Sequence, residues 1–258
     1  MNNKLLLFAT LFITSTFVFC KEKSFKTDNL PISKIAEIPL PKGFERVVVD
    51  KDSFGEWLRN FPLSKDNTVY LYDGSVKNNQ HVHYAVLDIS VGTKNLQQCA
   101  DAIVRLKAEY HFSRKEYTKI NFVAGKKNTY NFLFYATKMQ CFTHDCLMEF
   151  LQEVFINYGT YNLEEQLKPI ANYATMSVGD VFVKGGGPGH AMMVADVAIN
   201  KATGQKIYLL MQSFMPAQSV HVVVNPTNLN FNPWYVASET TITTPGWIFT
   251  KAQLKRWQ

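Results

Sequence analysis

Charged residues are scarce in this chain, at 19% of its 258 residues, and the basic residues form no run interleaved with aromatic side chains. Such runs are typical of nucleic-acid-binding segments, so their absence argues against a nucleic-acid partner. The net charge of +6 is modest and would suit an anionic polymer or lipid surface. No low-complexity tract or internal repeat is present, and 47% of the residues are hydrophobic. The composition excludes a disordered chain and predicts a globular protein with a large core.

Long hydrophobic runs are also few. The apolar run LLLFATLFITSTFVF, residues 5–19, is too short for a comfortable membrane span, and Cys20 and a polar segment follow it. This arrangement predicts a signal peptide over residues 1–20, of the lipoprotein type with Cys20 acylated. Cleavage without lipidation is the alternative, because Phe19 stands where a small residue is usual. We therefore expect an exported cell-envelope protein that touches the membrane only through its lipid anchor, or else a periplasmic or secreted one.

Cysteine is rare, with four residues in the chain, and Cys20 is assigned to the anchor. Cys141 and Cys146 of the segment CFTHDC are close enough in sequence to form a disulfide in an oxidising compartment, which would leave Cys99 as a free thiol. Metal binding through Cys141, His144 and Cys146 is an alternative, although this spacing matches no common zinc pattern. We expect no cofactor.

Two interpretations of Cys99 follow from its surroundings. Cys99 shares one face of a predicted helix with Ile103 and Tyr110, where a cysteine behaves as a small core residue. Asn95 and Gln98, however, form a capping signature that places the thiol near the start of this helix. The partial positive charge at a helix N-terminus lowers the pKa of a thiol and favours the nucleophilic thiolate.

The second half of the chain is rich in predicted strands. The segments DVFV, HAMMVADVA, KIYLLMQSF, VHVVV and WIFTKA follow one another after residue 179, and no helix long enough for a parallel crossover separates them. Together with the helices predicted before them, they indicate an α+β fold with an antiparallel sheet or small barrel. We expect a tether over residues 21–44 and a single domain over 45–258, with an N-terminal elaboration at 45–140 and a core at 141–258.

The glycine-rich segment KGGGPGHAMMVADV opens a strand and lacks the lysine and hydroxyl ending of a phosphate-binding loop. A turn explains its glycines, but a turn does not require His190 at the first position of the next strand. Among the other histidines, we predict that His81 and His83 are solvated and that His221 is a surface or sheet-packing residue. Asp73 is predicted to lie in a turn.

Residues 179–250 resemble the sheet of NlpC-type papain-like cysteine hydrolases. In that family a Gly-Asp pair opens the first strand, a histidine begins the second, and a polar residue on the third orients the histidine. The matching residues are Gly179 and Asp180, His190, and Gln212. The whole chain, from WLRNFPL and LYDGS to PGHA, QSFMPAQ and HVVVNP, is also similar to a broad family of bacterial exported proteins of unassigned function.

The first resemblance implies Cys99 as nucleophile, His190 as base and Gln212 as the residue that orients the imidazole. The glycines before His190 would let a substrate approach closely. Cys146 is the alternative nucleophile, because it stands nearer to His190 in sequence and begins a helix after Asp145. The expected function is a cysteine amidase or endopeptidase acting on a cell-wall peptide or another amide. A non-catalytic envelope lipoprotein that binds a ligand or partner is the alternative, and the oligomeric state stays open.

Overall fold

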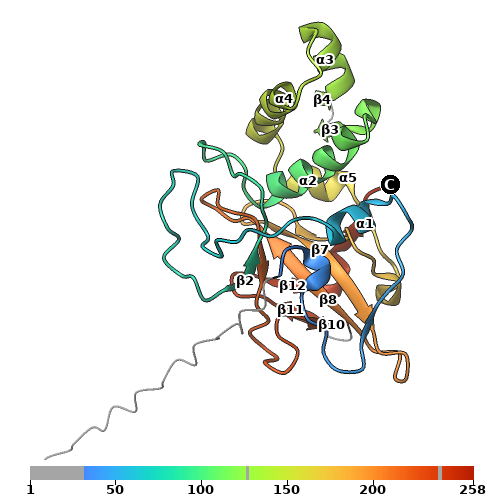
Figure 1. The fold of residues 1–258 in the computed structure, drawn as a ribbon. Helices are drawn as coiled ribbons and strands as arrows, with labels where there is room; N and C mark the ends of the chain where they lie inside the picture. Colours follow the sequence, from blue (N-terminus) through green and yellow to red (C-terminus); the bar gives the residue numbers. More distant parts are fainter. Residues whose placement is uncertain (1–31, 126–127, 238–239) are drawn as a thin grey trace, which may run out of the picture.

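A nine-stranded antiparallel sheet forms the centre of the computed structural model, which describes residues 32–125, 128–237 and 240–258 (Figure 1). Its main path runs in the order β2-β9-β8-β7-β6-β13-β5, with β1 paired to β7 and β10 paired to β8. The strands of this sheet are β1 (Glu45–Arg46), β2 (His83–Val86), β5 (Lys168–Pro169), β6 (Val181–Lys184), β7 (His190–Ile199), β8 (Lys206–Gln212), β9 (His221–Val223), β10 (Tyr235–Val236) and β13 (Leu254–Arg256). The expected α+β class with an antiparallel sheet is confirmed.

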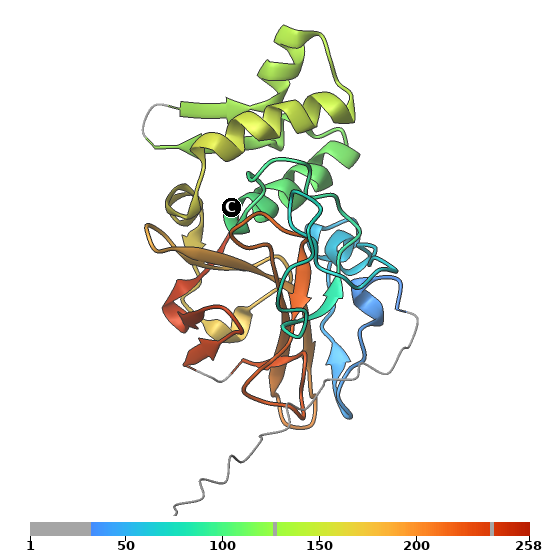
Figure 2. The ribbon, with the colours of Figure 1, turned by 90° about the vertical axis from the view of Figure 1, so that its left-hand side faces the viewer.

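The helices precede most of these strands in the chain. They are α1 (Phe54–Arg59), α2 (Cys99–Ser113), α3 (Phe132–Met139), α4 (His144–Asn157) and α5 (Thr160–Gln166), with short 3-10 turns at Ile35–Glu37, Tyr117–Lys119, Tyr173–Thr175 and Lys251–Gln253. Two hairpins, β3 (Asn121–Ala124) with β4 (Asn128–Asn131) and β11 (Thr241–Thr243) with β12 (Ile248–Thr250), stand apart from the main sheet. Both views show α3, α4 and the β3–β4 hairpin projecting beyond α2, away from the sheet (Figure 2).

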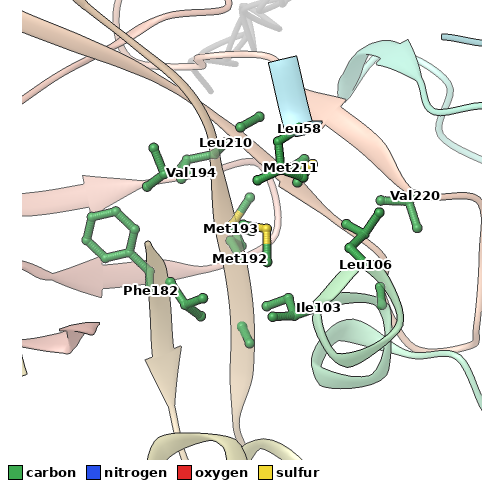
Figure 3. Packing of buried hydrophobic residues seen from close by; sticks show 14 of the residues in the cluster. Leu58, Ile103, Leu106, Phe182, Met192, Met193, Val194, Leu210, Met211 and Val220 are labelled. Atoms are coloured by element: carbon green, nitrogen blue, oxygen red, sulfur yellow. The ribbon is translucent and has the colours of Figure 1, made fainter. Parts of the chain in front are cut away.

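Strand β7 lies at the centre of the core. It is buried at every position except its last residue, so its sequence does not alternate between apolar and polar side chains as a half-exposed strand would. Helices α1 and α2 both pack against it. Figure 3 shows Ile103 and Leu106 of α2 close to Met192 and Met193 of β7, within one continuous hydrophobic cluster. The start of α2 is thereby held beside the start of β7.

A buried ionic cluster fastens the N-terminal segments to β7. Asp196 is fully buried, and its two carboxylate oxygens accept hydrogen bonds from Arg46 Nε and Arg59 Nε, each at 2.6 Å. Arg59 also donates to the backbone carbonyls of Val47 and Val197. The charge on Asp196 is therefore fully paired, as a buried carboxylate requires, and the cluster ties β1 and α1 to the sheet.

The chain joins the core earlier than the sequence suggested. Ile35 and Ile38 are fully buried, and Trp234 Nε1 donates a hydrogen bond to Pro39 O at 2.8 Å. The described end of the predicted tether, residues 21–44, is thus part of the domain, which corrects that boundary. The predicted signal peptide and Cys20 lie outside the described residues. Within the described ranges, no helix has the length and apolar character needed to cross a membrane.

The predicted disulfide between Cys141 and Cys146 is present, and it joins the segment directly after α3 to the first turn of α4. The side chain of Thr143 caps α4 by accepting a hydrogen bond from Cys146 N. The boundary predicted between residues 140 and 141 falls between these two helices, which the disulfide joins. Metal binding by Cys141, His144 and Cys146 is also wrong, because the bridge consumes both thiolates and His144 Nε2 lies 2.8 Å from Glu109 Oε1.

Candidate functional site

Cys99 is the first residue of α2. Gln98, rather than the predicted Asn95, is the N-cap, and Gln98 N donates to Asp101 Oδ2 at 3.0 Å in a capping box. The sequence therefore predicted the position of the thiol in the first turn correctly but placed the cap three residues early. Asn95 instead supports the loop that follows β8, because its Oδ1 accepts a hydrogen bond from Ala217 N at 2.8 Å.

The packing of α2 on β7 brings Cys99 next to His190. The backbone N–H of Ala191, the residue after His190, acts on the Cys99 thiol and favours its thiolate, as do the N–H groups of Ala100 and of Cys99 itself. Cys99 and His190 are far apart in sequence, and the structure places them at neighbouring positions across the α2–β7 contact. Among the hydrogen bonds of the described residues, none joins the Cys99 sulfur directly to a His190 nitrogen.

The thiol of Cys99 is protonated in this structure. Only 9% of Cys99 is exposed, and burial, with a smaller contribution from the Asp101 carboxylate, raises the pKa of the thiol to about 11. The loss of solvation outweighs the three backbone N–H groups, so the predicted lowering of this pKa by the helix terminus is wrong. Asp101 is itself buried; burial raises its pKa, and its Oδ1 has no partner among the described residues.

His190 begins β7, as predicted, but it is only 2% exposed. Its ring packs against Phe214, Trp247 and Phe249, with centroid distances of 4.8, 5.5 and 5.9 Å. Burial lowers the pKa of the imidazole to about 4, so His190 is neutral at physiological pH. Phe214 and Trp247 are half-buried, whereas Phe249, the third ring that contacts His190, is fully buried.

The predicted bond between His190 and Gln212 is present and is the first link of a buried polar chain. His190 Nε2 lies 2.7 Å from Gln212 Oε1, and Gln212 Nε2 lies 3.4 Å from His221 Nε2. His221 Nδ1 in turn lies 2.8 Å from the backbone oxygen of Ser219. His190, Gln212 and His221 come from β7, β8 and β9, three consecutive strands of the sheet.

The backbone oxygen of Ser219, at the end of this series of hydrogen bonds, determines which groups donate and which accept. A carbonyl oxygen only accepts, so His221 Nδ1 carries the proton that bonds to Ser219 O. His221 is fully buried, and burial lowers its pKa to about 3, so the ring is neutral and its Nε2 accepts from Gln212 Nε2. Gln212 Oε1 consequently accepts from His190 Nε2–H. Neutral His190 is left with an unprotonated, basic Nδ1.

His221 was predicted only as a surface or sheet-packing histidine, and its hydrogen bond to Gln212 was missed. Gln212 and His221 are partners in the β8–β9 register, which the sequence does not reveal. His83 is 7% exposed and its ring lies 5.9 Å from that of His221, so the prediction that it is solvated is wrong. His81 is exposed as expected. Asp73 lies in a turn, where its Oδ1 accepts a hydrogen bond from Ser75 N at 3.0 Å.

The glycines before His190 mainly make room for α5. A Cβ atom on Gly189 would collide with Thr160 Oγ1, and one on Gly185 would collide with Glu164 Oε2. Only Gly186 and Gly187 border open space. We expected these glycines to let a substrate approach closely. At Gly185 and Gly189 this expectation is corrected, because the missing side chains allow α5 to pack there.

The other two sequence candidates have structural roles. Cys146 is bonded to Cys141, so it is excluded as the alternative nucleophile. Asp180 anchors the C-terminal strand, because its carboxylate accepts hydrogen bonds from Arg256 Nε at 2.6 Å and Nη2 at 2.8 Å. Within the ranges that the structure describes, no group of three or more histidine, cysteine or acidic side chains could hold a metal ion.

The fold and the site together define an α+β protein with a thiol at a helix start, packed beside an imidazole that an amide orients. Residues 35–256 match the family described as "Domain of unknown function (4846)", and the chain belongs to this family. This agrees with the expected similarity to proteins of unassigned function. Neither the curated proteins nor the solved structures provide a match to the chain.

Proposed function

We propose that this chain is an exported cell-envelope protein that hydrolyses an amide bond with a papain-like arrangement of Cys99, His190 and Gln212. The observation that supports this most is the packing of α2 on β7, which brings Cys99 at the start of α2 near the Ala191 N–H, next to His190 at the start of β7. The second support is the bond from His190 Nε2–H to Gln212 Oε1, which leaves Nδ1 as the base.

The proposed reaction starts from a neutral thiol and a neutral imidazole. With a pKa of about 11 for Cys99 and about 4 for His190, the ionised pair is a minor species at rest. His190 Nδ1 takes the thiol proton as the sulfur attacks the carbonyl carbon, much as a serine–histidine pair works. Collapse of the tetrahedral intermediate breaks the C–N bond, and Nδ1 returns the proton to the leaving amine. Water then hydrolyses the thioester and regenerates the thiol.

Access to the pair requires movement of the aromatic cover. Phe214 and Trp247 lie over the His190 ring, and Trp247 belongs to the segment between β11 and β12. In the proposed enzyme, a substrate displaces these side chains and then excludes water from the reacting groups. A peptide of the cell wall, or another amide of the envelope, is the proposed substrate class.

The test is hydrolysis of cell-wall stem peptides by the full chain, followed by mass spectrometry of released products and of an acylated Cys99. Cys99→Ala and His190→Ala should abolish both signals, whereas His81→Ala, which changes an exposed histidine, should leave them unchanged. Product formation that survives Cys99→Ala would refute the proposed nucleophile. A fold check by circular dichroism separates loss of activity from loss of structure.

A non-catalytic binding protein is the second candidate, and the burial of Cys99 and His190 favours it. On this alternative the thiol is a packing group, so Cys99→Ala should preserve ligand or partner binding. Cys99→Ser should lower the free energy of unfolding by about 1–3 kcal/mol, because it buries a hydroxyl at an apolar position. Acylation of Cys99 by any stem peptide would contradict this candidate.

A further inference from the structure

Lys107 lies two turns along α2 from Cys99 and has an unusual environment for a lysine. Its Nζ lies 4.6 Å from the ring centroid of Phe54, 5.7 Å from that of Tyr110 and 6.0 Å from that of Trp257. The side chain is half-buried, and burial lowers its pKa to about 8. The ammonium has lost much of its water, and three ring faces lie near it.

A cavity of about 290 Å³ opens in front of this ammonium. It lies where α1, α2, the start of β6 and the end of β13 meet, close to the C-terminus marked in Figure 1. Its lining consists of Phe54, Lys107, residues 177–180, Arg256 and Trp257. This volume is just below the range of about 300–1,000 Å³ that is usual for small-molecule sites, so only a small ligand would fit.

The charges around the cavity do not balance. The carboxylate of Asp180 is engaged by Arg256 Nε and Nη2 and by Ser177 N, so it is not available to Lys107. Glu116, whose charge acts on Lys107, is engaged by Lys119 and by other basic side chains. No ion pair of Lys107 is present among the described residues. One desolvated cation therefore faces the cavity, and a ligand anion would neutralise it.

We propose that this cavity binds a small organic monocarboxylate, with the carboxylate against Lys107 Nζ and an aromatic or apolar body against Phe54 and Trp257. A phosphate would be recognised best by the fork of an arginine. The fork of Arg256 is already occupied by Asp180, which leaves a single point charge and favours a monoanion. This site is independent of the proposed hydrolase, because none of its lining residues belongs to the Cys99–His190 pair.

The experiment uses the full chain with ¹³C-labelled lysine and three probes: benzoate, its neutral analogue benzamide, and inorganic phosphate. Benzoate should shift the Lys107 signal saturably and raise its pKa above its unliganded value. Benzamide should leave the pKa of Lys107 unchanged. An equal response to benzamide, or tighter binding of phosphate than of benzoate, would overturn the proposal.

Variants tested by calorimetry complete the design. Lys107→Gln should weaken benzoate binding about tenfold or more, since a charge-assisted contact is lost. Lys138→Gln removes an exposed lysine of α3 that does not line the cavity and is the matched control, for which the affinity should not change. Cys99→Ala should bind benzoate like the unmodified chain, so that failure of the hydrolase and failure of this site are distinguishable. An unchanged affinity in Lys107→Gln would refute the role of the ammonium.

Discussion

Gln212 and His221 are cross-strand partners on β8 and β9, and Gln212 Nε2 donates to His221 Nε2 over 3.4 Å. This contact decides which end of the Gln212 amide faces His190. Because both histidines are buried and neutral, the Ser219 carbonyl sets the position of the proton on His190 through two intervening side chains. In the proposed enzyme, His221 is thus a positioning residue for His190, without contact to a substrate.

The first prediction concerns this proton. In His221→Phe the Gln212 amide loses its acceptor and can rotate, so His190 should change from a single Nε2–H tautomer to a mixture. Nitrogen NMR of ¹⁵N-histidine-labelled protein distinguishes the two tautomers. His83→Phe is the matched control, since His83 packs against the His221 ring without bonding to Gln212. A His190 that stays purely Nε2-protonated in His221→Phe would contradict the relay.

The second prediction follows from the lowered pKa values of His190 and His221, about 4 and about 3. The unfolded chain binds a proton at each histidine near pH 6.5, whereas the folded chain does not, so each contributes stability that is lost as the pH falls below about 6.5. Between pH 7 and pH 5 the loss is about 2 kcal/mol for each histidine. Urea denaturation of His221→Phe should show a pH-dependent loss smaller by about this amount. An unchanged loss would show that His221 is not buried in the neutral form.

Local structure near the site was predictable from short patterns. Serine and threonine directly before a helical pattern indicate N-caps, and the hydroxyls of Ser53 and Thr143 accept the corresponding backbone hydrogen bonds at the starts of α1 and α4. The start of β7 at His190 also followed from the sequence, and its bond to Gln212 was expected from the resemblance to NlpC-type hydrolases; the bond can form because β7 and β8 are neighbouring strands. These features depend on contacts between residues that are close in sequence or on adjacent strands.

Features that depend on tertiary packing were missed. The burial of His83 and His221 requires the register of β2 on β9, and the paired charge of Asp196 requires two arginines from β1 and α1. The raised pKa of the Cys99 thiol has the same origin, because a helix terminus can be recognised in a sequence but the depth at which it is buried cannot. Burial changed the chemistry that was expected of the thiol without changing its place in the fold.

The third prediction concerns the buried ionic cluster. Asp196→Ala should lower the free energy of unfolding by about 3–5 kcal/mol, because it leaves Arg46 and Arg59 without their shared carboxylate. Chemical denaturation measures this loss. The control is Asp88→Ala, which removes an exposed carboxylate and should change stability by no more than about 0.5 kcal/mol. Equal effects in the two variants would show that the cluster does not stabilise the fold.

The fourth prediction concerns the proposed export and anchoring. Cys20→Ala should release the protein from membranes while leaving it outside the cytoplasm, because the apolar run at residues 5–19 remains intact. Cell fractionation with immunodetection measures both. Unchanged membrane association in Cys20→Ala would refute the proposed lipid anchor. Uncleaved full-length chain in the cytosol would contradict export.

The fifth prediction tests the protonation of Cys99 with an internal reference. In Cys146→Ser the disulfide is lost, so Cys141 becomes an ordinary, partly exposed thiol in the same molecule as buried Cys99. With a pKa of about 11 against about 8.5 for a free thiol, the thiolate fraction of Cys99 at pH 7 is about 300-fold smaller. Iodoacetamide should therefore label Cys141 at least about 300-fold faster, as peptide mass spectrometry would show.

Removing part of the aromatic cover formed by Phe214 and Trp247 should reduce the difference in labelling rate between Cys141 and Cys99. In the double variant Cys146→Ser with Trp247→Ala, water reaches the site, the pKa of Cys99 should fall, and its labelling should accelerate relative to Cys141. Adding His190→Ala to this double variant then distinguishes the proposed hydrolase from the non-catalytic binding protein. If His190 Nδ1 assists Cys99 as a nucleophile, the labelling of Cys99 should lose most of that acceleration. If Cys99 is only a packing residue, the acceleration should remain. Fast labelling of Cys99 near pH 6 in the chain with Trp247 intact would contradict the neutral pair altogether, because only a thiolate already ionised at rest reacts there.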